Sequence, residues 1–131
     1  MKLLVDSQSL IWYVDQDQML SPAAHRGMTD PANDLLLSAA SVWEIGIKVG
    51  LNKLTLSLPY RAWMERAISD LGLIILPITV EATDMQASLP WHHRDPFDRL
   101  IIAQSLVGNM AIVSSDQFFD QYGIKRLWCS A

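Results

Sequence analysis

Four carboxylates follow the segments of this chain that are expected to form buried strands. Asp6 and Asp116 come soon after short apolar runs, Glu44 lies in the helix expected after another, and Asp98 lies in the first turn of a strongly apolar helix. In an open parallel sheet, ligands bind outside the carboxyl ends of the strands. At about 4 Å and an effective dielectric near 20, one like-charge pair costs on the order of 4 kcal/mol. Carboxylates that converge there therefore need protons or cations to neutralise them.

Oxygen ligands without a dedicated set of Cys or His residues favour Mg²⁺ or Mn²⁺ over Zn²⁺. A divalent cation held by a few carboxylates can polarise a phosphodiester and stabilise its leaving oxygen. The four positions therefore favour metal-dependent phosphoryl chemistry.

The same residues also fit structural roles in helices. N-caps are expected at three acidic positions: Asp6, Asp95 and Asp116. Glu44 fits a capping box with Ser41 and an ion pair with Lys48 four residues later. Asp98 lies in a first helical turn, where a negative charge is favourable. From the residues alone, both interpretations stay open.

Apolar strands and amphipathic helices are expected to alternate along the chain. Strands are expected at residues 2–5, 35–37, 73–76, 111–113 and, as an edge strand, 125–128. Helices are expected at residues 7–14, 22–29, 39–49, 59–70, 79–88 and 96–107, with a short one starting at 116. Near-continuous apolar strands imply burial on both faces. The sequence therefore predicts an α/β fold, a single three-layer α/β/α sandwich with a central, mainly parallel sheet over residues 1–131.

Composition narrows the classes of function. Ten Lys and Arg residues against fourteen Asp and Glu residues give a net charge of −4, so a bulk basic surface for nucleic acid is absent. A nucleic-acid substrate would need a local basic patch or bound cations. The single Cys129 excludes an intrachain disulfide and fits the reducing cytoplasm. The most apolar stretch, 71–80, is too short to span a bilayer, so no membrane association is expected.

Two further groups of side chains could bind ligands. His92 and His93 are adjacent, and neighbours in a loop seldom chelate one ion, so they are expected at the surface or supporting a ligand. Trp12, Trp43 and Trp128 lie in apolar periodic segments and are expected in the core or an interface.

Several motifs resemble those of PIN-domain nucleases, in the same order. Residues 3–12 (LLVDSQSLIW) resemble the opening motif, and residues 38–48 (SAASVWEIGIK) resemble the second. Residues 93–104 (HRDPFDRLIIAQ) resemble the third, while 113–116 (VSSD) and 122–124 (YGI) resemble the closing segment. The match is closest to VapC-like toxins of type II toxin–antitoxin systems and runs through nearly the whole chain.

The resemblance implies a PIN-like fold and a metal-dependent endoribonuclease that hydrolyses RNA phosphodiester bonds. Asp6, Glu44, Asp98 and Asp116 would be the catalytic, metal-binding residues, with Mg²⁺, or Mn²⁺, as the cofactor. The implied mechanism is in-line attack by a metal-activated water that leaves a 5′-phosphate and a 3′-hydroxyl. A cognate antitoxin would inhibit the enzyme, and the chain would form a homodimer.

Supporting roles follow from the matched motifs. Ser7 keeps the hydroxyl of the Thr that is common after the first Asp, and it would orient the metal shell or the substrate. Lys48, Arg94 and Arg99 are candidates for contacting phosphate or holding carboxylates, with solvated or ion-paired side chains as the alternative. Asp95 belongs to the third motif but is expected to act as a cap more than as a ligand.

One position departs from the family pattern, and two other functions compete. Gln8 stands where the nearest relatives often have His, which puts any role of that His in doubt. One alternative is a catalytically inactive PIN-like scaffold that binds proteins, although the complete carboxylate set argues against it. The other is a receiver or phosphatase-like metal-binding α/β domain, for which Asp6 would accept a phosphoryl group.

Overall fold

A five-stranded parallel sheet forms the centre of the molecule. The computed structural model describes residues 1–129, and the strand order is β3-β2-β1-β4-β5. The strands are β1 (Lys2–Val5), β2 (Asp34–Ser38), β3 (Ile74–Leu76), β4 (Ala111–Val113) and β5 (Arg126–Leu127). All four strand pairs are parallel. The predicted α/β fold with a central parallel sheet is confirmed.

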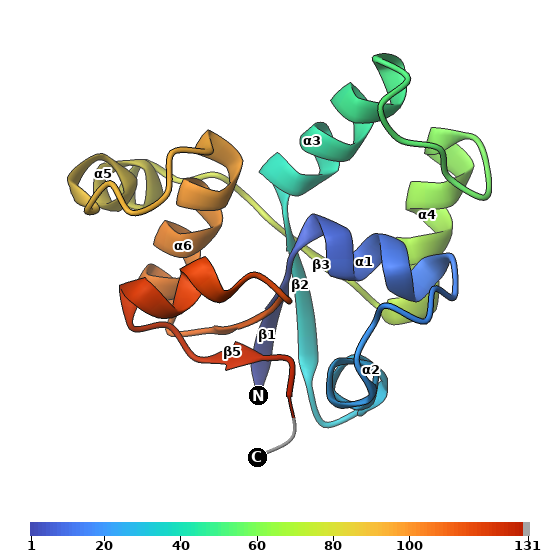
Figure 1. Cartoon of the computed structure of the whole chain (residues 1–131), viewed down its shortest axis with the longest axis horizontal. Helices are drawn as coiled ribbons and strands as arrows, with labels where there is room; N and C mark the ends of the chain where they lie inside the picture. Colours follow the sequence, from blue (N-terminus) through green and yellow to red (C-terminus); the bar gives the residue numbers. More distant parts are fainter. Residues whose placement is uncertain (130–131) are drawn as a thin grey trace.

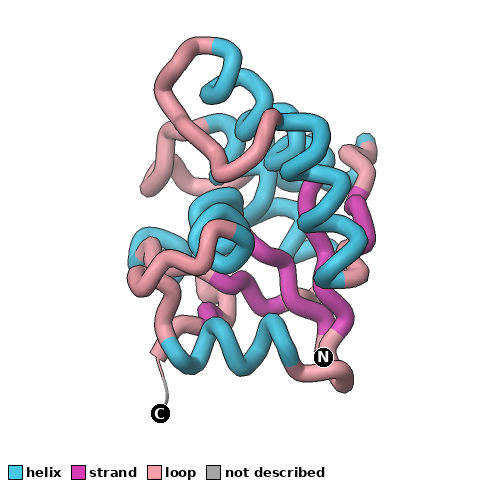
Figure 2. The backbone as a smooth tube through the Cα atoms, turned by 90° about the vertical axis from the view of Figure 1, so that its right-hand side faces the viewer, coloured by secondary structure: helices cyan, strands magenta, loops and turns pink. Residues whose placement is uncertain are grey.

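Helices cover both faces of this sheet (Figures 1 and 2). They are α1 (Ser7–Val14), α2 (Pro22–Thr29), α3 (Ala39–Gly50), α4 (Tyr60–Leu71), α5 (Val80–Ser88), α6 (Pro96–Gly108) and the 3₁₀ helix η1 (Gln117–Tyr122). Within residues 1–129, no helix is both long and apolar enough to cross a membrane.

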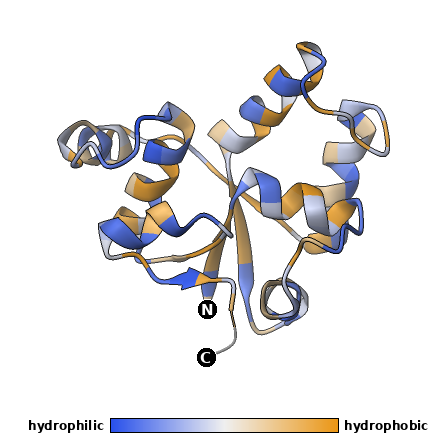
Figure 3. Ribbon diagram, viewed as in Figure 1, coloured by the Kyte–Doolittle hydropathy of each residue, from blue (hydrophilic) through white to orange (hydrophobic). Residues whose placement is uncertain are grey.

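Side chains of β1 point alternately to the two faces of the sheet, and a separate apolar core lies on each face. Leu3 and Val5 pack into the core that contains Leu10 of α1 and Trp63 of α4. Leu4 faces the opposite core, which contains residues of α6 and η1. Figure 3 shows the central strands largely in hydrophobic colours, between helices that carry both kinds of residue. Burial on both faces explains why the strands read as continuous apolar runs.

The shorter elements differ from the prediction at their ends. The edge strand β3 starts at Ile74 rather than residue 73, it pairs with β2, and Ile74 is 51% exposed. The last strand covers Arg126–Leu127 only. A single partner strand provides fewer hydrogen bonds to extend an edge strand.

Candidate active site

The structure brings the four predicted carboxylates to one cleft. The cleft has a volume of about 390 Å³ and lies where β1 and β4 end, between α1, α3 and α6. Its acidic lining residues are Asp6, Glu44, Asp95, Asp98 and Asp116. The cleft therefore lies at the edge of the sheet where parallel α/β folds bind ligands.

Asp6 both caps α1 and lines the cleft. Its Oδ1 accepts a hydrogen bond of 2.8 Å from the backbone N–H of Ser9, so the N-cap interpretation is confirmed. Burial raises the pKa of the Asp6 carboxyl, and the negative charge of Asp116 adds to this. Hydrogen bonds from Ser114 and Ser9 act in the opposite direction. A cap role and a place in the cleft are thus compatible for one side chain.

The two other expected caps are also present. Oδ1 of Asp95 accepts hydrogen bonds from the backbone N–H groups of Phe97 (2.8 Å) and Asp98 (3.2 Å) at the start of α6. Oδ1 of Asp116 accepts one of 2.9 Å from the N–H of Phe118 and caps η1. Each cap fixes the direction in which its carboxylate enters the cleft.

The pKa of the Asp98 carboxyl is strongly raised in the cleft. Burial, followed by the charge of Asp95 and then those of Glu44 and Asp116, raises the pKa of Asp98 from 3.8 to about 7. His93 acts in the opposite direction. Burial and three neighbouring carboxylates therefore oppose the ionised form of Asp98.

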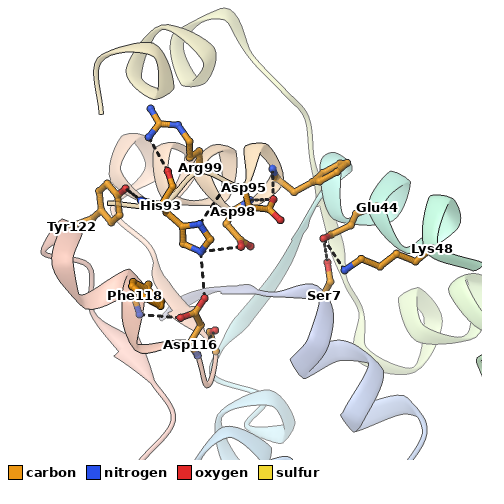
Figure 4. A network of polar contacts seen from close by, with 12 residues as sticks. Ser7, Glu44, Lys48, His93, Asp95, Asp98, Arg99, Asp116, Phe118 and Tyr122 are labelled. Carbon is orange, nitrogen blue, oxygen red and sulfur yellow. Dashed lines mark hydrogen bonds and ion pairs between the residues drawn. The ribbon is translucent and has the colours of Figure 1, made fainter. Parts of the chain in front are cut away.

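His93 lies directly against two of the carboxylates (Figure 4). Its Nε2 is 3.1 Å from Oδ2 of Asp98 and 3.4 Å from Oδ2 of Asp116. The ring stacks on Phe119 with centroids 6.2 Å apart, and the backbone N–H donates to the Tyr122 hydroxyl oxygen at 2.8 Å. From the sequence, His93 was expected at the surface or in a role supporting a ligand. Its position just before Asp95 in the third motif was the available signal for this contact.

Two side chains hold the Glu44 carboxylate, Ser7 from α1 and Lys48 from α3. The Ser7 hydroxyl donates to Oε1 of Glu44 at 2.7 Å, and Lys48 Nζ lies 3.1 Å from its Oε2. The expected ion pair between Glu44 and Lys48 is therefore confirmed. The expected capping box is wrong, because Ser38 caps α3 and Ser41 lies inside the helix. Ser7 and Lys48 thus both contact a cleft carboxylate, and for Lys48 holding a carboxylate was one of the two expected roles.

Arg99 does not contact the cleft carboxylates, which corrects its candidate role. The side chain is 1% exposed and lies 3.7 Å from the centroid of the Trp91 ring. Its guanidinium donates to backbone carbonyls before α6, those of Gln86, Leu89, Pro90 and His93, at 2.7–3.3 Å. These hydrogen bonds occupy the donors that a phosphate or a carboxylate would need. Arg99 instead holds the segment that carries His93.

Unlike the buried Arg99, the side chains of Arg94 and Lys53 are exposed. Arg94 is exposed and makes no ion pair among the described residues, so it stays a candidate for contacting phosphate. Lys53, which the sequence analysis missed, is exposed and lines the cleft. It follows α3 in a segment expected to be a loop, where apolar periodicity carries no signal.

The donor set fits a divalent cation. The lining carboxylates supply the oxygen ligands that hard cations prefer. His93, Asp98 and Asp116 each offer one ligand atom, and the three atoms lie within 4.8 Å of one another. Burial, followed by the charges of neighbouring carboxylates, raises the pKa values of Asp6 and Asp98, and a bound cation would favour the ionised form of both.

The fold and the cleft define an α/β protein with an anionic site at its strand ends. The chain belongs to the PIN domain family, which matches residues 3–125. Among curated proteins, no sequence matches the chain significantly.

Solved structures share the fold at low sequence identity. A chain of VapBC2 from Rickettsia felis, bound to a DNA fragment from their promoter, is similar with a TM-score of 0.75 and 14% identity, covering 98% of this chain and 100% of that chain. A chain of VapBC-1 from nontypeable Haemophilus influenzae is similar with a TM-score of 0.65 and 14% identity, and the match covers 96% of each chain. A chain of FitAcB from Neisseria gonorrhoeae is similar with a TM-score of 0.63 and 15% identity, and the match covers 95% of this chain and 96% of that chain. At these identities the likeness establishes the fold.

Proposed function

We propose that this protein is a metal-dependent endoribonuclease toxin that hydrolyses RNA phosphodiester bonds and is inhibited by a cognate antitoxin. The observation that carries the proposal is the meeting of Asp6, Glu44, Asp98 and Asp116 in one cleft. Membership in the PIN domain family supports it, because PIN domains are typically metal-dependent nucleases.

The four carboxylates would hold Mg²⁺, with Mn²⁺ as the alternative cofactor. Bound there, a divalent cation would supply Lewis-acid polarisation of the phosphodiester and neutralise charge on the leaving oxygen. Ser7 fixes the orientation of Glu44 through its 2.7 Å hydrogen bond. His93 fixes Asp98 and Asp116 relative to each other.

Asp98 has to be ionised to act as a ligand. Without a cation, its pKa of about 7 leaves much of the carboxyl protonated at neutral pH. Ligand carboxylates must be ionised, so cation affinity is expected to rise with pH through this range. Lys48 stays paired with Glu44 and limits the negative charge at that side of the cleft.

The structural relatives support the proposal of a protein partner. The similar chains come from VapBC and FitAB assemblies, which supports a cognate antitoxin as the partner here. We further propose one nuclease domain over residues 1–131, a homodimer and a cytoplasmic location.

The deciding experiment is cleavage of total RNA by the purified protein. We expect cleavage with Mg²⁺ or Mn²⁺, none with a chelator, and mapped ends carrying a 5′-phosphate and a 3′-hydroxyl. Asp6→Asn serves as the matched control, because it removes one ligand charge and Asn remains a good N-cap. Cleavage that persists in chelator, or in Asp6→Asn, would contradict the proposal. Absence of cleavage under all conditions would favour an inactive binding scaffold.

A further inference from the structure

The cleft is not acidic throughout. Besides the carboxylates, its lining includes Ile11 of α1, Lys48 at the last turns of α3, and Lys53 and Leu54 just after α3. A helix rises about 1.5 Å per residue, so Lys48 lies about 6 Å further along α3 than Glu44. The cleft therefore continues along α1 and α3 from the carboxylates to an apolar and cationic part.

The turn after α3 fixes this part of the cleft. The N–H of Lys53 donates to the carbonyl of Lys48 at 2.9 Å, and the N–H of Asn52 donates to that of Val49 at 3.1 Å. Asn52 has a φ of 57°, in the left-handed region. These three features make a Schellman motif, which folds the chain back over the last helical turn. Lys53 is thus placed by backbone hydrogen bonds and does not lie at the tip of a loose loop.

The two lysines in the cleft have different electrostatic surroundings. Lys48 Nζ is committed to Glu44 at 3.1 Å. The exposed ammonium of Lys53 makes no ion pair with any of residues 1–129. With a net charge of −4, the protein offers a polyanion few attractive positions. An unpaired cation beside the carboxylates is therefore a specific place for a phosphate.

Apolar side chains lie beside this cation. Leu54 and Ile11 are partly buried against the core, and both line the cleft. Aliphatic side chains make van der Waals contacts with a ribose or with the face of a base, which are the less polar parts of a nucleotide. A base within a duplex is stacked and paired, so only a single-stranded nucleotide can offer its face.

We infer that Lys53, Leu54 and Ile11 form a subsite for the nucleotide next to the scissile phosphate of single-stranded RNA. Lys53 binds the backbone phosphate of that nucleotide, and the two apolar side chains contact its ribose or base. This inference rests on the proposed ribonuclease function and assigns a nucleotide-binding role to three side chains outside the carboxylate cluster.

Binding can be measured separately from cleavage. The full chain with Asp98→Asn is titrated against a fluorescently labelled single-stranded RNA oligonucleotide, and anisotropy is recorded at several salt concentrations. Adding Lys53→Ala is expected to raise Kd about five- to tenfold and to reduce the slope of log K against log salt by about 0.7, the value for one phosphate contact on a single strand. Adding Leu54→Ser is expected to raise Kd without changing this slope.

Lys125→Ala, in the same background, is the matched control. Lys125 is exposed but lies near the start of β4, at the opposite end of the sheet. The control should leave Kd and the salt slope unchanged, and duplex RNA of the same sequence should bind more weakly than the single strand. An unchanged slope in Lys53→Ala, or an equal effect of Lys125→Ala, overturns the phosphate contact. Equal binding of duplex RNA overturns the contact with the nucleotide face.

The outcome is separable from that of the proposed function. If wild-type protein cleaves no RNA but Lys53→Ala still weakens binding, the subsite stands and the ribonuclease proposal fails. If wild-type protein cleaves RNA and Lys53→Ala alters neither binding nor KM, the subsite fails and the ribonuclease proposal stands. Thermal unfolding of each variant checks that the fold is retained.

Discussion

Nε2 of His93 lies 3.1 Å from Oδ2 of Asp98, and the same nitrogen lies 3.4 Å from Oδ2 of Asp116. One imidazole therefore joins the first turn of α6 to the segment after β4. The position of the ring is fixed by Phe119, on which it stacks, and by the Tyr122 hydroxyl, which accepts from its backbone N–H. The relative positions of the two carboxylates consequently depend on the loop before α6.

His93→Ala is expected to lower RNA cleavage or apparent Mg²⁺ affinity about 10–100-fold, the usual effect of removing a group that orients ligands. Initial rates measured over a Mg²⁺ titration check this. His92→Ala is the matched control, since His92 is exposed and its ring packs on Tyr122. Equal rates for wild type and His93→Ala at all Mg²⁺ concentrations would show that the ring has no such role.

Asp98→Asn is expected to stabilise the metal-free protein at pH 8. Ionised Asp98 is opposed by burial and by neighbouring carboxylates, and each unit of its pKa shift corresponds to about 1.4 kcal/mol. Asn keeps an oxygen acceptor for His93, so we expect the free energy of unfolding to rise by about 2 kcal/mol. Urea unfolding in chelator measures it. A loss of stability would show that the negative charge contributes mainly to the helix start.

The stability of the metal-free protein should fall as pH rises from about 4 to about 7. In this window folded Asp98, with a pKa raised from 3.8 to about 7, binds more protons than the unfolded chain does. Burial raises the pKa of Asp6 in the same direction. Melting temperatures in chelator across this range test the slope, which Asp98→Asn should flatten and saturating Mg²⁺ should reverse. A melting temperature that rises steadily to pH 7 in chelator would refute the sign.

Arg99→Ala is expected to lower the free energy of unfolding by about 3 kcal/mol. The change leaves one buried and three partly buried carbonyls without their donor, and a buried unsatisfied group costs about 1–3 kcal/mol. Denaturant unfolding measures the loss. Arg61→Ala is the control, because the Arg61 side chain is 91% exposed and its ion pair with Glu65 lies at the surface, where such pairs contribute little to stability. Similar small losses for both variants would show that the carbonyls find other donors.

Asp95→Ala should cost about 1 kcal/mol of stability, the usual value of an N-cap. Asp95→Asn should keep this stability, because Asn can accept the same hydrogen bonds from Phe97 and Asp98. If Asp95 is a cap more than a ligand, Asp95→Asn should also keep cleavage within about tenfold of wild type, as supporting changes do. A loss of cleavage as large as that in Asp98→Asn would make Asp95 a ligand.

Features determined by local sequence were predictable, and features determined by tertiary packing were not. Asp6, Asp95 and Asp116 were found at strand ends and helix starts because caps and strand ends have local signatures. Arg99 was misassigned because its partners are carbonyls of a loop, which leave no mark in the residue types. Lys53 was missed because its place depends on Asn52 adopting a left-handed conformation.

Exposure was similarly hard to predict for aromatic side chains. Trp43 was expected in the core or an interface from its apolar surroundings in the sequence, and its 66% exposure places it outside the core. Its ring meets Phe97 of α6 edge-on, with centroids 5.9 Å apart. Helical periodicity identifies an apolar stripe, but it does not show where the neighbouring helix ends.

The strand that is synthesised first lies in the middle of the sheet, and one of its neighbours is β4. Ser9 Oγ donates to the carbonyl of Val113, which is 104 residues away. Until β4 pairs with β1, Asp6 has no Asp116 beside it. A nascent chain still emerging from the ribosome therefore carries no assembled acidic cleft. Any chemistry of this cleft can begin only after translation has passed residue 116.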